Sequence, residues 1–219
     1  MADFETILGG VGVKVGPAAL DRAYDESGGY LARVWAKNRD VPVAEHVRAI
    51  LGAVDARLVA RIPADVLSAL VDAYARPILM VPPAIDDGAR AALERLRADG
   101  RRLAVVSNTM RTPGTALRAL LQRYGLLTTF AHATFSDEVG VRKPAREIFA
   151  LTLRALGVEP AAAVHVGDDP ILDVLGARTA GLRTIQVTSA APNALGPERP
   201  DATIPNLAAL PAAIDQLEK

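Results

Sequence analysis

Cysteine is absent from the 219-residue chain, which excludes disulfides, thiolate catalysis and the usual cysteine-based zinc sites. Aromatic residues make up only 4% of the sequence, too few for platforms that stack single-stranded nucleic acid. No apolar run approaches the roughly 20 residues that span a bilayer, and no signal-peptide pattern opens the chain. The 25 Lys and Arg residues balance 25 Asp and Glu residues, so no net charge draws the chain to nucleic acid or membrane. We therefore expect a cytoplasmic protein that binds a small, locally charged molecule.

The first 80 residues predict helices and no strand. Apolar residues recur at helical spacing in PAALDRAYDESGGYLARVWAK, VAEHVRAILGAVDARL and PADVLSALVDAYARPIL. Pro63 and Pro77 mark helix ends within this region. Phe4, Ile7 and Leu8 have the spacing of a further short helix that packs on the same lobe. We expect residues 1–80 to form a separate α-helical region.

Residues 81–219 show a different pattern, in which helices alternate with short apolar strands. Helices are predicted over about residues 87–98, 114–124, 145–156 and 171–180. They are followed in turn by the segments LAVV, TTFAHATFS, AAVHVG and LRTIQVT. This alternation indicates an α/β fold with a Rossmann-like parallel sheet covered by helices on both faces. Ligands of such sheets bind at the carboxyl ends of the strands.

Polar side chains follow these strands where the strands end. Ser107 and Asn108 close one strand, and Asp168 and Asp169 close another, with Asp173 in the next helical turn. Three such close carboxylates repel one another unless a cation or hydrogen bonds compensate, and Mg²⁺ prefers oxygen ligands of this kind. The alternative is that the Ser, the Asn and one Asp cap helices while the remaining acids are solvated.

Lys143 is one of only four lysines in a chain that otherwise uses arginine. Its compact charge on a flexible stem suits a phosphate oxygen or a pair of carboxylates, although a solvated loop lysine is the alternative. We assign no catalytic role to His46, His132 or His165. His165 lies within an apolar strand and is expected to be a core residue with a satisfied ring.

Together these strand ends resemble three motifs of the haloacid dehalogenase superfamily, a group dominated by phosphatases. LAVVSNT resembles its second motif, FSDEVGVRKPAREIF its third and VHVGDDPILDVLGARTAGLRTI its fourth, over roughly residues 80–210. The resemblance implies that Ser107 binds phosphate beside Asn108 and that Lys143 stabilises it. It also implies that residues 81–219 form the catalytic core, with the preceding helices as a cap over small substrates.

The fourth motif carries the metal site in this resemblance. It implies that Asp168 and Asp169 are Mg²⁺-site acids and that Asp173 supports either them or Lys143. The sequence GDDP favours the metal-dependent phosphatases over the metal-independent dehalogenases of the superfamily. The implied function is Mg²⁺-dependent hydrolysis of a small phosphorylated metabolite.

The first motif of the superfamily, an apolar strand ending in Asp-x-Asp, has no counterpart in the chain. Only two residues precede Asp3, and a strand needs about five or six. Because this strand is central to the sheet in the family, its loss is expected to expose two strand edges and leave a groove through the core.

Three explanations of the missing motif stay open. The stated start lies downstream of the true one, another segment or subunit supplies the strand, or the protein is a catalytically inactive relative that binds a phosphorylated ligand or a protein partner. The chain as given is expected to turn over poorly, and the open groove favours a homo-oligomer.

Overall fold

A computed structural model describes residues 2–189 and 196–218 of the chain. The chain divides into two compact units. The helical unit comprises Met1–Pro82, Thr109–Arg123 and Ser136–Gly140, and the sheet unit comprises the remaining segments, Pro83–Asn108, Tyr124–Phe135 and Val141–Lys219. The boundary expected at residue 80 falls near the end of the first helical segment. Residues 109–123 and 136–140 belong to the helical unit, whereas the sequence pattern predicts that they belong to the sheet region of residues 81–219.

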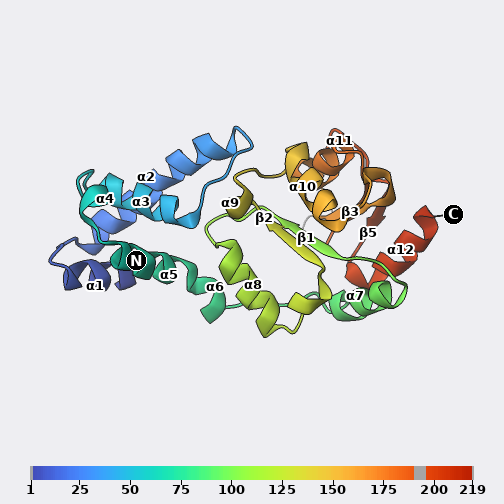
Figure 1. Cartoon of the computed structure of the whole chain (residues 1–219), viewed down its shortest axis with the longest axis horizontal. Coiled ribbons are helices and arrows are strands. Elements are labelled where there is room, and N and C mark those ends of the chain that lie inside the picture. The colour runs from blue at the N-terminus through green and yellow to red at the C-terminus, as the bar shows by residue number, and fades with distance from the viewer. Residues whose placement is uncertain (1, 190–195, 219) are drawn as a thin grey trace. The chain divides into compact units, whose positions relative to one another are not determined.

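The helical unit is built around one apolar core. Phe4 and Leu8 of the first helix are buried there, together with Leu20, Ile50 and Leu70. The prediction that the chain begins with an amphipathic helix that packs on the helical region is therefore confirmed. The helices of this unit are α1 (Ala2–Gly10), α2 (Pro17–Trp35), α3 (Val43–Val54), α4 (Leu58–Arg61), α5 (Ala64–Ala75), α6 (Pro77–Met80), α8 (Gly114–Arg123) and α9 (Ser136–Val139) (Figure 1).

Local contacts explain why α8 and α9 belong to the helical unit. Arg123 at the end of α8 donates a hydrogen bond to the carbonyl oxygen of Leu79 in α6 at 2.8 Å. The buried carboxylate of Asp137 in α9 accepts from the backbone N–H of Gly114 at 3.2 Å. These long-range bonds cannot be read from helical periodicity, which reports only which face of a helix is apolar.

The sheet unit contains all the strands of the described residues. Helix α10 packs on β1 and β2, α11 packs on β4, and α12 packs on β5 and α7 (Figure 1). Its helices and strands are α7 (Ala89–Ala98), β1 (Ala104–Ser107), β2 (His132–Phe135), α10 (Arg146–Leu156), β3 (Val164–Gly167), the π-helix η3 (Pro170–Leu175), α11 (Gly176–Thr179), β4 (Arg183–Val187), β5 (Ala202–Ile204) and α12 (Leu210–Leu217). Single 3-10 turns lie at Leu127–Thr129, Pro160–Ala162 and Leu207–Ala209.

The strands of the sheet unit form two separate parallel sheets. β1 pairs with β2, with Ala104 opposite His132, while β4 lies between β3 and β5. The predicted parallel pairing is confirmed, and the strands fall into two sheets as expected when the central strand is missing. Within the described residues β1 and β3 each leave one edge unpaired. These are the two exposed edges that the missing first motif predicts.

Two clusters of apolar side chains stabilise the sheet unit. One joins α7, α12, β4 and β5, and the other joins α10, α11 and the segments around them. The buried members of the first are Ala92, Leu96, Ile185, Val187, Ile204, Leu210, Ala213 and Ile214. The buried members of the second are Val141, Ile148, Phe149, Leu153, Ala177 and Leu182.

The segment after β3 differs from the α-helix expected over residues 171–180. A π-helix runs from Pro170 to Leu175, and α11 follows it. The backbone N–H of Val174 donates to the carbonyl oxygen of Asp169, five residues earlier, at 3.2 Å. The wider turn begins at the acidic pair that ends β3, and such turns occur frequently at functional sites.

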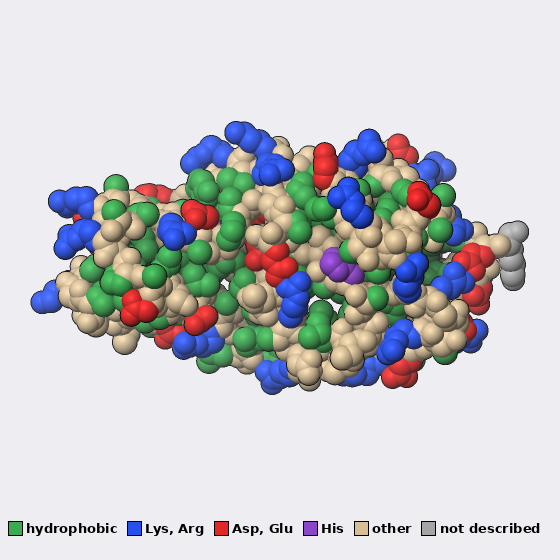
Figure 2. All heavy atoms as spheres, viewed as in Figure 1, with side chains coloured by type: hydrophobic (Ala, Val, Ile, Leu, Met, Phe, Trp, Pro, Cys, Tyr) green, Lys and Arg blue, Asp and Glu red, His purple; other side chains and the backbone are tan. Residues whose placement is uncertain are grey.

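The surface carries charges of both signs. Figure 2 shows Lys and Arg side chains interspersed with Asp and Glu over the face in view, in keeping with the zero formal net charge. Among the described residues, none of the helices is both long and apolar enough to cross a membrane.

Candidate active site

Asn108 joins the carboxyl end of β1 to the loop that carries Lys143. Its side-chain N–H donates to the carbonyl oxygen of Lys143 at 3.0 Å, and its side-chain oxygen accepts from the Lys143 backbone N–H at 2.8 Å. The pair of bonds uses both ends of the amide and fixes the backbone of Lys143. Asn108 therefore positions the lysine that the sequence singles out.

The side chain of Lys143 reaches the end of β3. Its Nζ lies 2.6 Å from Oδ1 of Asp173, and the two side chains are only 12% and 5% exposed. A charge-assisted bond of this length in a site with little water holds the ammonium group in place. Of the two partners that the family resemblance implies for Asp173, the other acids or Lys143, the structure places Lys143 in contact with it.

Asp173 has further partners besides Lys143. Nε2 of His165 lies 2.8 Å from Oδ1 of Asp173, and the backbone N–H of Asp169 donates to Oδ2 at 3.0 Å. Although burial alone would raise the pKa of Asp173, hydrogen bonding from His165 and the charge of Lys143 lower the pKa well below its usual range. The carboxylate of Asp173 is therefore ionised, and both of its oxygens already accept hydrogen bonds.

His165 has a structural role in this site that its place in an apolar strand did not predict. Burial lowers the pKa of His165, against the opposing effect of its bond to Asp173. Its ring also packs edge-on against Phe149 at 5.0 Å between centroids. The prediction that the ring of His165 has a hydrogen-bond partner in the core is confirmed. The apolar strand pattern does not indicate that this partner is a carboxylate of the candidate site.

Gly167 ends β3 where the chain passes Asp173. A Cβ atom at this position would lie 2.2 Å from Cγ of Asp173, far closer than any real contact. The glycine of the GDD sequence therefore makes room for the Asp173 carboxylate.

The adjacent acids Asp168 and Asp169 differ in their environment. Oδ1 of Asp169 accepts from the backbone N–H groups of Ile171 and Leu172, both at 2.8 Å, and so caps η3. Asp168 is exposed, and its carbonyl oxygen accepts from the side chain of Gln186 at 3.3 Å. Within the described residues its carboxylate has no hydrogen bond or ion pair. The sequence left open that one of these acids caps the following helix, and Asp169 is the acid that does so.

Two of the three acids predicted to bind magnesium are suited to that role. The carboxylates of Asp168 and Asp169 fit an ion that takes one or two protein carboxylates and keeps waters and substrate oxygens. Asp173 does not fit as a ligand because Lys143 and His165 hold it. Among the described residues, no group of three or more His, Cys, Asp or Glu side chains is arranged to hold a metal. Two acids therefore remain as candidate ligands.

The other predicted site residue, Ser107, is the last residue of β1 and lies opposite Phe135 in the register with β2. It is adjacent to Asn108 in the chain. In the part of the chain that the structure describes, its hydroxyl makes no hydrogen bond to the other residues of the set. Its predicted phosphate-binding role stays a prediction.

The profile of the haloacid dehalogenase-like hydrolases matches residues 19–181. The chain belongs to this hydrolase family. Human haloacid dehalogenase-like hydrolase domain-containing protein 3 is 37% identical over 137 residues, which are 60% of this chain and 52% of the human protein. The phosphoserine phosphatase of Thermus thermophilus is 38% identical over 115 residues, 52% of this chain and 43% of that enzyme. The chain thus spans about half the length of the curated relatives it matches.

Solved structures of the haloacid dehalogenase family share this fold. A 2-haloacid dehalogenase from Pseudomonas syringae superposes with a TM-score of 0.68 over 99% of this chain and 89% of that chain, at 23% identity. At that identity the likeness concerns the fold alone. The α/β architecture predicted from the sequence is confirmed, and several of the relatives are named as phosphatases.

Proposed function

We propose that this member of the haloacid dehalogenase family is a phosphatase-type hydrolase that removes phosphate from a small phosphorylated molecule with the help of Mg²⁺. The observation that carries the proposal is the placement of Lys143, which Asn108 holds through its backbone and Asp173 through its ammonium group. A fixed cation between two strand ends suits an anionic group at the carboxyl edge of the sheets. The relatives named as phosphatases support this reading.

Each site residue has a separate task in the proposed reaction. Lys143 neutralises charge on the phosphoryl oxygens, and the hydroxyl of Ser107 orients them by hydrogen bonding. Asp168 and Asp169 are the residues that would hold the magnesium ion, which supplies further charge neutralisation. His165 and Asp173 keep the lysine in position and do not touch the substrate.

None of the carboxylates of Asp3, Asp169 and Asp173 is suitably placed to act as the nucleophile. A covalent route needs a carboxylate nucleophile. Asp169 caps η3, Asp173 is held by Lys143, and Asp3 lies in the helical unit, where it pairs with Arg76 at 3.1 Å. We propose that turnover depends on an Asp-x-Asp carboxylate supplied by a further extended segment.

Phosphate release from a panel of phosphoesters, with and without Mg²⁺, tests this function. We expect little release from the 219-residue chain and Mg²⁺-dependent release from a version extended at its amino end by an apolar strand ending in Asp-x-Asp. Asp168→Asn in the extended version should lower the rate by about tenfold or more, because a metal carboxylate is lost. Asp215→Asn, at an exposed position of α12, is the matched control and should leave the rate unchanged.

Absence of release by the extended version across the whole panel would exclude the proposed activity. A non-catalytic protein that binds a phosphorylated ligand is the second candidate, favoured by the absence of a suitably placed nucleophile among the described residues. Under that reading, phosphoesters should raise the melting temperature of the extended version without being hydrolysed. Lys143→Met should abolish this rise.

A further inference from the structure

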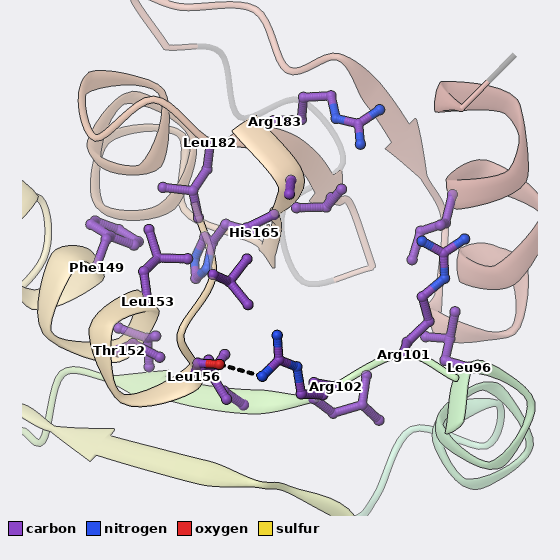
Figure 3. Close-up of a pocket in the computed structure, with 18 of the residues that line it drawn as sticks. Leu96, Arg101, Arg102, Phe149, Thr152, Leu153, Leu156, His165, Leu182 and Arg183 are labelled. Atoms are coloured by element: carbon purple, nitrogen blue, oxygen red, sulfur yellow. Dashed lines mark hydrogen bonds between the residues drawn. The ribbon is translucent and has the colours of Figure 1, made fainter. Parts of the chain in front are cut away.

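The helical unit contains a cavity of about 510 Å³. Its walls come from α1, α2, α5 and α6 and from the loop that follows β1, all within this unit. The cavity of the sheet unit differs in kind, because apolar side chains such as Phe149, Leu153 and Leu182 surround it (Figure 3). That cavity is lined by β1 and β3 and corresponds to the gap that the missing first motif predicts. The cavity of the helical unit has no such explanation, and charged groups take part in its lining.

Arg111 is the cation of the cavity in the helical unit. Its guanidinium carbon lies 3.8 Å from the centre of the Tyr24 ring, in the geometry of a cation–π interaction. Nη1 of Arg111 donates to the hydroxyl oxygen of Tyr74 at 3.4 Å. A Cβ atom on Gly28, one turn after Tyr24 in α2, would lie 3.4 Å from Nη2, so the guanidinium lies against the helix backbone. These contacts hold the half-buried side chain in place.

The positive charge of Arg111 has no carboxylate partner within residues 2–189 and 196–218. Arg118 of the same unit, by contrast, pairs with Glu138. A half-buried charge is costly unless it is paired or hydrogen-bonded, and a cation–π contact compensates for only about 0.5–2 kcal/mol. The guanidinium group carries five N–H groups and makes a single hydrogen bond to the described residues. Most of its donors are therefore available to a ligand.

Tyr74 adds a second donor beside the guanidinium group. Its hydroxyl oxygen accepts from Arg111, so the hydroxyl hydrogen can be donated to another acceptor. Burial raises the pKa of Tyr74 to about 12, and the hydroxyl therefore stays protonated at neutral pH. The ring is held by tilted contacts with Phe4 and Tyr24, at 6.4 Å and 6.3 Å between ring centres. A fixed neutral donor and a fixed cation thus border the same cavity.

Two acids in the lining limit the negative charge that the cavity accepts. Asp3 is already paired with Arg76 at 3.1 Å. Asp21 lies one turn before Tyr24 on α2 and forms no ion pair with the described residues. Arg111 and Asp21 therefore contribute one unpaired charge of each sign. Because Asp21 repels a second negative charge, the cavity favours a monoanion over a dianion such as a phosphate monoester.

We propose that this cavity binds a small organic monocarboxylate, whose carboxylate accepts hydrogen bonds from Arg111 and Tyr74 and whose apolar body packs on Phe4 and Ile78. A planar guanidinium group can bind both oxygens of a carboxylate through two parallel N–H···O bonds. Apolar walls with a few polar groups that fix orientation are typical of small-molecule sites. The residues proposed for phosphate transfer are not part of the lining, so the inference does not rest on the proposed phosphatase activity.

Calorimetric titration of the whole chain with phenylacetate tests this site, with phenylacetamide as the matched neutral ligand. We expect phenylacetate to bind saturably and phenylacetamide to bind about tenfold more weakly or worse, because the amide offers no charge to Arg111. Phenyl phosphate should displace phenylacetate only when it is in excess, because Asp21 repels the dianion. In hydrogen-exchange measurements, phenylacetate should slow exchange around Tyr74 and Arg111 and change little in β5.

Variants of the cavity test the location. Arg111→Gln removes the cation and should lower the affinity for phenylacetate about tenfold or more. Tyr74→Phe keeps the packing of the ring and should lower it about twofold to tenfold, because one neutral hydrogen bond is lost. Arg33→Gln, at an exposed position of α2 outside the cavity lining, is the matched control and should bind as the wild type does. If Arg111→Gln fails to fold, Tyr74→Phe and the comparison of the two ligands on the wild-type chain decide the question.

Several results would overturn the proposal. These are an absence of saturable phenylacetate binding, equal affinity for phenylacetamide, and undiminished affinity in a folded Arg111→Gln variant. Displacement of phenylacetate by an equal or lower concentration of phenyl phosphate would overturn the assignment to a monocarboxylate. Phosphate release is not measured in this experiment, so its outcome is separate from that of the proposed function.

Discussion

The amide of Asn108 and the backbone of Lys143 exchange two hydrogen bonds, of 3.0 Å and 2.8 Å, across the carboxyl end of β1. Asn108→Ala removes both bonds from half-buried main-chain groups. We expect the free energy of unfolding to fall by about 1–3 kcal/mol, as measured by urea denaturation. Gln122→Ala, at an exposed position of α8, is the control and should change stability little. An Asn108→Ala variant as stable as the wild type would show that solvent replaces the two bonds without cost.

Asp173→Asn removes the charge that faces Lys143 while keeping the shape of the side chain. The ammonium group is then left in a nearly buried position without its counterion, and we expect a loss of about 3 kcal/mol in the free energy of unfolding. The double variant Lys143→Met, Asp173→Asn should recover part of this loss, because no uncompensated charge remains. Equal losses in the single and double variants would contradict the coupling.

The stability of the chain should fall as the pH drops below about 6.5, in part because of His165. Burial lowers the pKa of His165 in the folded state, so between the folded and unfolded pKa values the unfolded state binds the additional proton. The stabilisation is complete above the pKa of His165 in the unfolded state. It is lost as the pH falls towards the lower pKa of His165 in the folded state. The lowered pKa of Asp173 also makes stability fall with falling pH, but this effect operates below about pH 3.9.

Chemical denaturation between pH 7 and pH 5 measures this dependence. The curve for His165→Gln should be flatter than that of the wild type. Identical slopes for wild type and His165→Gln would show that the buried histidine does not contribute.

Gly167→Ala should disturb the site because the added methyl group collides with Asp173. The new methyl group would overlap the carboxylate of Asp173, so the bond to Lys143 must lengthen or β3 must shift. We expect a clear fall in melting temperature. Gly52→Ala in α3 is the matched control, because its Cβ meets only Val59 at an ordinary 3.5 Å, and a helix-interior alanine should raise stability by about 0.5–1 kcal/mol. A neutral Gly167→Ala would contradict the tight packing at the end of β3.

The parts of the fold that local pattern controls were predictable from the sequence. The helix carrying Phe4 and Leu8 and the strands β1 to β4 follow from the periodicity of apolar residues. The family resemblance left two partners open for Asp173, and the structure shows Lys143 as one of them. The family resemblance also predicted the open strand edges, because it identified which strand the chain lacks. Each of these features depends on residues close in sequence or on a motif whose geometry is shared across the family.

Other features depend on contacts between distant residues and could not be predicted in this way. The membership of α8 in the helical unit depends on bonds such as that between Arg123 and Leu79. The partnership of His165 with Asp173 joins a side chain within β3 to one in the π-helix that follows it, which neither segment's own pattern indicates. An apolar strand pattern and a helical pattern look the same whether or not such contacts form.

The division of the sheet unit into two apolar clusters affects its cooperativity. No backbone ladder joins the two sheets of the described residues, which are coupled through the polar bonds around Lys143 and through the apolar cluster that α10 shares with α11. In calorimetry, this unit should therefore melt over a broader interval than its size implies, with a van't Hoff enthalpy below the calorimetric one. A backbone ladder that joined the two sheets would narrow this transition, so the width of the calorimetric peak reports how tightly the two halves are coupled.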